Sequence, residues 1–202
     1  MKLLENKTRT REEWLIDGMA KLVKQVFEPV DIEVPTDIKV SCGFPASGGR
    51  SGAKNQAIGV CHNRNSSEAG VNEIFISPVV SDSVHALDVL SHEMIHAVDD
   101  CKNGHKKPFK DMAVKIGLTG KMTATVAGDE LKKKLEQIVL ELGDYPHAEV
   151  STANKKKQST RNLKVECSSC GFGWRASKSM IARMTNSTCN GCGSDTLTLE
   201  SV

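Results

Sequence analysis

The stretch SHEMIHAVDDCKNGH at residues 91–105 contains the side chains best suited to metal chemistry. On a helix, residues four apart project from the same face, so His92 and His96 can bind one metal ion together. Imidazole nitrogens bind Zn²⁺ at about 2.0–2.1 Å. Glu93 follows the first histidine, where its carboxylate can reach a water molecule at the metal without being a ligand. This H-E-x-x-H pattern predicts metal-assisted hydrolysis, with Glu93 accepting the proton of the water that attacks a carbonyl group.

A catalytic zinc ion usually has three protein ligands and one open position. His105 is the best candidate for the third ligand, because Asn103 and Gly104 can turn the chain back after the helix. The alternative is a chance H-E-x-x-H on an amphipathic helix. The helical pattern around the motif and the additional histidine at turn-compatible spacing both favour the metal site.

Other polar residues near the motif leave two interpretations open. Asp88, four residues before His92, and Asp99, three after His96, are candidates for accepting hydrogen bonds from the ligand rings. Solvated surface charge explains them equally well. The remaining histidines, His62, His85 and His147, are expected to lie at the surface or, for His85, in the core, and not to bind the metal.

Four of the seven cysteines form a second metal-binding pattern near the C-terminus. Cys167 and Cys170 make one C-x-x-C pair, Cys189 and Cys192 another, and 18 residues separate the pairs. Each pair is followed by glycine, which lets backbone amides point at thiolates. The spacing predicts a structural zinc ribbon, with a redox dithiol as the alternative. We therefore expect two Zn²⁺ ions per chain, one catalytic and one structural.

Helix-capping residues and the spacing of apolar residues predict the elements that position these side chains. Thr10 and Glu13 form a capping-box pattern at the start of an amphipathic helix that Pro29 closes. Further patterns predict three strands, a helix containing the histidine motif, a helix opening near Pro108 and ending at Gly117, and a last helix before Gly143. The expected strands are 37–42, 57–61 and 71–76. The helix that contains the histidine motif is expected at 82–100, and the last helix at 129–142. The Gly- and Ser-rich segment 45–56 is expected to be a mobile loop.

Composition and charge suggest a division of the chain. Residues 150–162 have almost no apolar content and are interpreted as a basic linker between a domain at 1–149 and a ribbon at 163–202. Residues 1–150 carry a net charge of −3 and residues 151–202 a net charge of +5. This bias, with Lys155–Lys157 in the linker, makes DNA a candidate partner of the C-terminal part.

Two aromatic residues follow the first cysteine pair. Phe172 is expected in the small core of the ribbon, and Trp174 either in that core or exposed for stacking on bases.

Bulk properties exclude some classes of protein. No apolar run among the 202 residues approaches the roughly 20 that a membrane span needs. The N-terminus becomes charged after two leucines, which does not fit a signal peptide. These features predict a cytoplasmic protein, with association with the nucleoid as a further possibility, and no membrane partner.

Residues 57–125 resemble the SprT-like family of zincin peptidases, which includes Spartan. The resemblance rests on IGVC at 58–61, VNEIFISP at 71–78, VLSHEMIHA at 89–97 and GHKKPFKDMAVKIGL at 104–118. The order of the H-E-x-x-H motif, a Gly-His pair and a zinc ribbon also matches the family. The eight residues between His96 and His105 make a shorter connection than in some members.

The resemblance implies an α+β fold with a minimal zincin-like peptidase domain and a β zinc ribbon. It also implies zinc ligands at His92, His96 and His105, Glu93 as the catalytic carboxylate, and a protein substrate. In Spartan-type members that substrate is protein trapped on DNA. Two competing hypotheses remain. One is a nucleic-acid-binding or adaptor protein with a vestigial peptidase site, and the other is a peptidase whose ribbon binds only protein partners.

Overall fold

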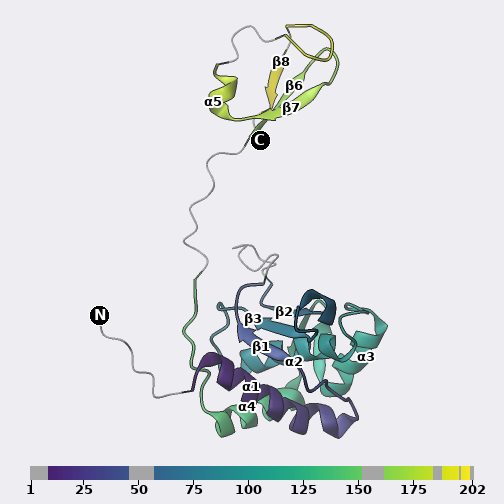
Figure 1. The fold of residues 1–202 in the computed structure, drawn as a ribbon, viewed down its shortest axis with the longest axis vertical. Coiled ribbons are helices and arrows are strands. Elements are labelled where there is room, and N and C mark those ends of the chain that lie inside the picture. Colours follow the sequence, from purple (N-terminus) through teal and green to yellow (C-terminus); the bar gives the residue numbers. More distant parts are fainter. Residues whose placement is uncertain (1–8, 46–56, 152–161, 184–187, 196, 201–202) are drawn as a thin grey trace, which may run out of the picture. The chain divides into compact units, whose positions relative to one another are not determined.

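The computed structural model describes residues 9–45, 57–151, 162–183, 188–195 and 197–200, without side-chain detail for the last range. The chain forms two compact units, Met1–Ala153 and Asn154–Val202. The architecture is α+β, as predicted (Figure 1). The predicted loop at 45–56 and the linker at 150–162, including Lys155–Lys157, lie almost entirely outside the described residues. None of the described helices is long and apolar enough to cross a membrane.

The first unit begins with helix α1, Arg11–Leu22, whose capping box is present as predicted. Thr10 Oγ1 accepts from the backbone amide of Glu13, and the Glu13 carboxylate accepts from the Thr10 amide. The helical path continues through a π turn, Val23–Phe27, and a 3-10 turn, Glu28–Val30, before it ends. The prediction that the helix closes at Pro29 is therefore confirmed to within one residue.

A three-stranded sheet follows, with strand order β1-β3-β2. Its strands are β1, Lys39–Cys42, β2, Gly59–His62, and β3, Glu73–Ile76. β1 runs parallel to β3, and β2 runs antiparallel to it. All three strands were predicted within two residues of their bounds. In the described sheet, β2 is the edge strand that contacts α2.

Helix α2, Ser83–Val98, carries the histidine motif through the centre of the first unit. Most of its residues are buried, including Leu87, Leu90, Met94 and Ile95. Helix α3, Lys107–Ile116, ends at Gly117, whose φ of 99° is the left-handed conformation that glycine adopts without strain. Helix α4, Asp129–Leu142, packs against both α1 and α2. The core is shared by all four helices and the sheet.

The first unit contains a two-stranded antiparallel hairpin between α3 and α4 that was not predicted. Its strands are β4, Leu118–Lys121, and β5, Ala124–Ala127. β4 contacts α3, and β5 contacts α2 and α4. Along β5, Thr125 and Ala127 are half-buried, whereas Ala124 and Val126 are exposed. The hairpin thus presents one face to the helix that bears the histidines.

The second unit is a small three-stranded antiparallel sheet with strand order β7-β6-β8. Its elements are β6, Leu163–Cys167, β7, Gly173–Ala176, a short helix α5, Lys178–Ile181, and β8, Leu197–Glu200. The strand-rich character was predicted; α5 was not.

Candidate metal centres

The three histidines of the motif converge, as the helical spacing and the turn after it predict. His92 and His96 lie on one face of α2, and His105 approaches from the turn before α3. The Nε2 atom of His105 is 3.1 Å from that of His92 and 3.2 Å from that of His96. Around a tetrahedral zinc ion with bonds of about 2.0–2.1 Å, neighbouring nitrogens would be about 3.3–3.4 Å apart. The arrangement therefore fits three imidazole ligands on one ion.

Desolvation favours the neutral form of these imidazoles, which is the form that binds metals. Loss of solvation, together with the charges that His96 and His105 would carry, lowers the pKa of His92 to about 3. Desolvation, followed by the charge of His105, lowers the pKa of His96 to about 4. Desolvation also lowers the pKa of His105. At neutral pH each ring can thus offer a lone pair to a cation.

Phe109 of α3 provides an apolar floor beneath the three rings. The side chain is 1% exposed, and its ring stacks on that of His96 with centroids 4.5 Å apart. The rings of His92 and His105 also contact it, at 4.8 Å and 5.0 Å. Because α3 carries Phe109 and follows His105 directly, packing of this helix on α2 positions the third histidine.

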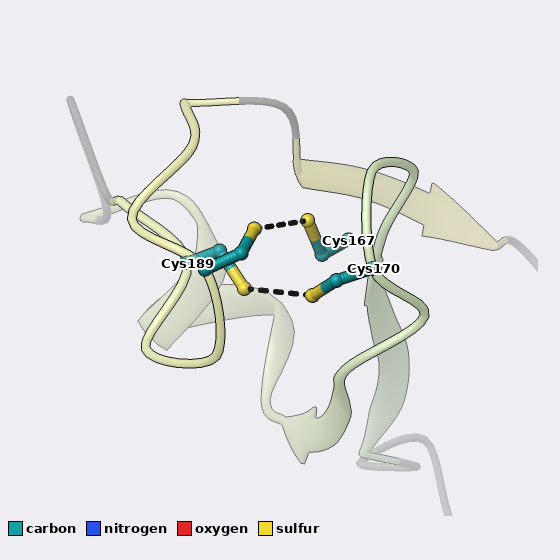
Figure 2. Close-up of side chains that lie close together, drawn as sticks. Cys167, Cys170 and Cys189 are labelled. Carbon is teal, nitrogen blue, oxygen red and sulfur yellow. Dashed lines mark hydrogen bonds between the residues drawn. The ribbon is translucent and has the colours of Figure 1, made fainter.

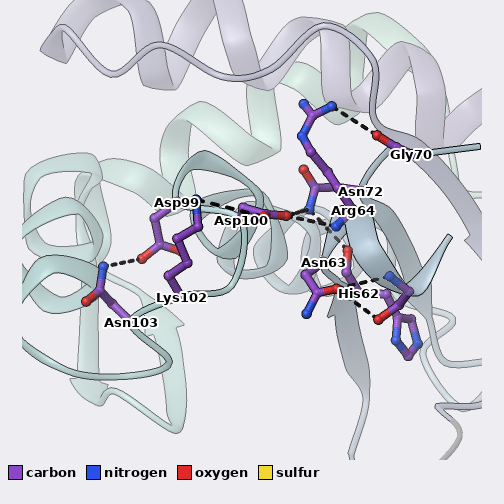
Figure 3. A network of polar contacts seen from close by, with 10 residues as sticks. His62, Asn63, Arg64, Gly70, Asn72, Asp99, Asp100, Lys102 and Asn103 are labelled. Atoms are coloured by element: carbon purple, nitrogen blue, oxygen red, sulfur yellow. Dashed lines mark hydrogen bonds and ion pairs between the residues drawn. The ribbon is translucent and has the colours of Figure 1, made fainter.

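The turn between His96 and His105 is fixed by the polar network shown in Figure 3. Asp100 and Cys101 both adopt left-handed backbone, with φ of 56° and 60°. The Asp100 carboxylate accepts hydrogen bonds from the backbone amide of Arg64 at 2.8 Å and from Asn72 Nδ2 at 3.1 Å. These bonds lower the pKa of Asp100, with the Arg64 amide as the largest cause. The strained reversal that brings His105 back is therefore anchored to the connection between β2 and β3.

Glu93 is buried beside the ligands, with 6% of the residue exposed. Desolvation, and next the neighbouring Cys101 thiol, raise the pKa of its carboxyl to about 8, whereas a hydrogen bond from the backbone amide of Cys61 acts in the opposite direction. Gly59 makes room for this carboxylate, because a Cβ there would lie 2.6 Å from Glu93 Oε1. A glutamate with a pKa near neutrality is suited to taking up and releasing a proton.

The predicted ring acceptors are in other contacts. Asp88 lies near the backbone amide of Ala127, and Asp99 accepts from Asn103 Nδ2 at 2.9 Å. The ring of His92 is instead hydrogen-bonded to Thr125, whose Oγ1 lies 2.8 Å from His92 Nδ1. Sequence reasoning missed Thr125, Gly59, Asp100 and Asn72. The only signal for them is tertiary, since each contacts its partner across more than 25 residues of chain.

The other histidines lie outside the cluster. His85 is exposed, which agrees with one of the two predicted environments. His62 is half-buried with its ring edge-on to Phe75, and His147 Nε2 lies 2.8 Å from the carbonyl oxygen of Pro78.

The four predicted cysteines of the second unit also converge (Figure 2). The Sγ atoms of Cys167 and Cys192 are 3.7 Å apart, and those of Cys170 and Cys189 are 3.6 Å apart. A tetrahedral zinc ion with Zn–S bonds of about 2.3 Å would space its sulfurs by about 3.8 Å. A hydrogen bond from the Ser194 hydroxyl is the main reason that the pKa of Cys167 falls to about 5, which favours the thiolate. This donor set fits a structural zinc ion.

The aromatic residues of the second unit differ from expectation in one respect. Phe172, predicted in the core, is 44% exposed, whereas Trp174 is half-buried. Their ring centroids are 6.0 Å apart. Phe172 lies against the second cysteine loop, where its side chain comes close to Gly191. Among the residues of this unit whose side chains are described, the buried ones are Val165, Cys167, Ala176 and Cys189.

Comparisons with family models, with curated proteins and with solved structures gave no match to this chain. No family model therefore names the SprT-like family that the motifs resemble. The structure defines a chain with two candidate metal centres, a three-histidine group and a four-cysteine cluster.

Proposed function

We propose that this chain is a zinc-dependent peptidase of the SprT-like type, with a zinc ribbon as its second unit. The observation that carries the proposal is the convergence of His92, His96 and His105 beside the buried carboxylate of Glu93. The first three would hold the metal and leave its fourth position open. When bound, zinc would supply Lewis acidity, which lowers the pKa of water towards about 7 and polarises a carbonyl group.

The residues of the chain would move the protons of the reaction. Glu93 would accept a proton from the attacking water as its oxygen bonds to the carbonyl carbon of the substrate. It would then pass that proton to the amide nitrogen as the C–N bond breaks, giving a carboxylic acid and an amine. Glu93 accepts a proton only as a carboxylate, and the charge of a bound zinc ion would favour that form against the desolvation that raises its pKa. The hydrogen-bonded turn after α2 and the packing of Phe109 would hold the site rigid.

The proposal is tested by removing and restoring the metal. Chelation of the full-length protein is expected to abolish cleavage of a fluorescein-labelled unfolded protein such as casein, and two added equivalents of Zn²⁺, one for each centre, to restore it. Fluorescence release measures the rate, and a chelator-treated sample given Mg²⁺ is the control, since Mg²⁺ prefers oxygen ligands. Cleavage that persists after complete loss of zinc would contradict the proposal.

A second candidate function, binding of single-stranded DNA, is favoured by the exposed ring of Phe172. Aromatic rings stack on bases with little sequence preference. The charge distribution, however, indicates that the phosphate contacts lie outside the ribbon. Residues 163–202 carry a net charge of +1, which four thiolates on one zinc ion would change to −1. Phosphate attraction would therefore come from the basic segment at 155–161, with the ribbon adding stacking.

Two substitutions separate these contributions. Changing Lys155, Lys156 and Lys157 to glutamine is expected to reduce the slope of log K against log salt by about 2 for single-stranded DNA, because about three phosphate contacts are lost. Phe172→Ala is expected to weaken binding by about tenfold with the slope unchanged, because stacking is not ionic. Fluorescence anisotropy at several salt concentrations measures both. Full-length protein that does not bind at low salt would favour a ribbon directed at protein partners.

A further inference from the structure

The unpredicted hairpin approaches helix α2 at two points that match in spacing. Thr125 Oγ1 lies 2.8 Å from His92 Nδ1, and the backbone amide of Ala127 lies near the Asp88 carboxyl, where it acts to lower the pKa that desolvation raises. Asp88 and His92 are one helical turn apart, about 6 Å, and Thr125 and Ala127 are two strand residues apart, about 6.6 Å. Both approaches can therefore occur at once, so β5 runs along the face of α2 that carries the candidate metal ligands.

The contact with Thr125 decides which nitrogen of His92 faces the metal position. The Nε2 atom of His92 points at His105, so it is the atom placed to bind a metal. In a neutral imidazole, the proton must then be on Nδ1, which makes Nδ1 the donor and the Thr125 hydroxyl oxygen the acceptor. An acceptor at this position holds the ring in the required tautomer and stops it from rotating.

We propose that Thr125 is a positioning residue for the three-histidine centre, and that it couples docking of the β4–β5 hairpin to zinc affinity. The inference depends on the metal centre of the proposed function and not on peptidase activity. By reciprocity, a bound zinc ion that needs the oriented His92 ring also stabilises the docked hairpin. The hairpin is therefore part of the metal site, although none of its residues is a ligand.

Thr125→Val is the informative substitution, because valine has the shape of threonine, keeps the strand preference and lacks the acceptor. We expect it to weaken zinc binding at the histidine centre by about 10- to 100-fold. Thr125→Ser keeps a hydroxyl and is expected to retain affinity within about threefold of the wild type. Thr119→Val is the matched control in the same hairpin. The Thr119 hydroxyl donates to the carbonyl oxygen of Val126 at 3.2 Å and does not contact a ligand ring.

Zinc affinity is measured on the full-length protein by competition with a chromophoric chelator, and the step lost in His96→Ala identifies the histidine centre. Hydrogen exchange of the amides of residues 124–127 gives a second readout. Zinc is expected to slow this exchange in the wild type and in Thr119→Val, and to slow it much less in Thr125→Val.

Equal zinc affinity of Thr125→Val and the wild type would overturn the inference. A loss of affinity in Thr119→Val as large as in Thr125→Val would also overturn it, because hairpin stability and not the hydroxyl would then be the cause. The test does not depend on catalysis, so a wild-type protein that binds zinc but cleaves no peptide would refute the peptidase proposal alone. Absence of any zinc step that depends on His96 would refute both.

Discussion

Glu93→Gln is expected to lower kcat/KM for peptide hydrolysis by about 10³-fold or more while zinc stays bound. Glutamine has the size of glutamate but cannot accept a proton from water, so the variant loses the base and keeps the packing. The Glu93 side chain lies close to Gly59, and an amide occupies the same space there as a carboxylate. Burial makes the charged form of Glu93 costly, so the free energy of unfolding should stay equal or rise.

Three measurements on one preparation make this prediction specific. Cleavage kinetics report the base, zinc content reports the ligands, and thermal unfolding reports the fold. His96→Ala is the contrasting variant, since it removes a ligand and should lose both the metal of that centre and the activity. Activity of Glu93→Gln within about tenfold of the wild type would contradict the proposed role and favour another base. Lack of activity in the wild type itself would favour the adaptor hypothesis.

The elements with strong local signals were predicted correctly. The start of α1 depends on side chains within four residues of each other, and the capping box of Thr10 and Glu13 forms as expected. The end of α3 depends on one glycine at a left-handed position, Gly117. The two histidines of α2 meet because the helical repeat places them there. Each of these features needs only a short stretch of chain, which explains why sequence alone specified them.

The β4–β5 hairpin could not be predicted, because its sequence contains little strand signal. Its strands read LTGK and ATVA, with two alanines and a glycine among eight residues, and only Leu118 is fully buried. The hairpin is held by contacts with α2, α3 and α4 that form only in the folded chain. The partner of His92 was missed for the same reason, since Thr125 is 33 residues away in sequence. The sequence instead suggested Asp88 and Asp99 as acceptors for the ligand rings, because they lie within four residues of His92 and His96.

Phe172 shows a different limit of sequence reasoning. An aromatic residue in a unit of about forty residues is expected to fill its core. In the structure, two of the buried positions of the second unit belong to the metal-ligand candidates Cys167 and Cys189. A core built around four sulfur atoms needs less aromatic filling, so Phe172 stays at the surface.

Cys189→Ser is expected to unfold the second unit and to reduce the zinc content from two ions per chain to one. Outside β8, the buried apolar side chains among the described residues of this unit besides the cysteines are Val165 and Ala176, and a module of about forty residues rarely folds without a staple such as a metal. Structural zinc contributes about 10–16 kcal/mol of apparent binding free energy at pH 7 in zinc-finger peptides, and in such modules binding is coupled to folding. Loss of one thiolate therefore removes the main source of stability of this unit.

The first unit should remain folded in the same variant, because it has its own continuous core. Hydrogen exchange is expected to become fast for the amides of β6 and β7 and to stay slow for those of α2. Zinc analysis should find one ion per chain, and cleavage of a short unstructured peptide should persist. Cys42→Ser is the matched control, since Cys42 is a free cysteine of β1 outside both metal centres and its loss should leave two zinc ions. A Cys189→Ser protein that keeps two zinc ions would show that the Cys189 thiolate is not needed to hold the metal, and one that loses a zinc ion but keeps slow exchange in β6 would show that the ribbon does not depend on its metal.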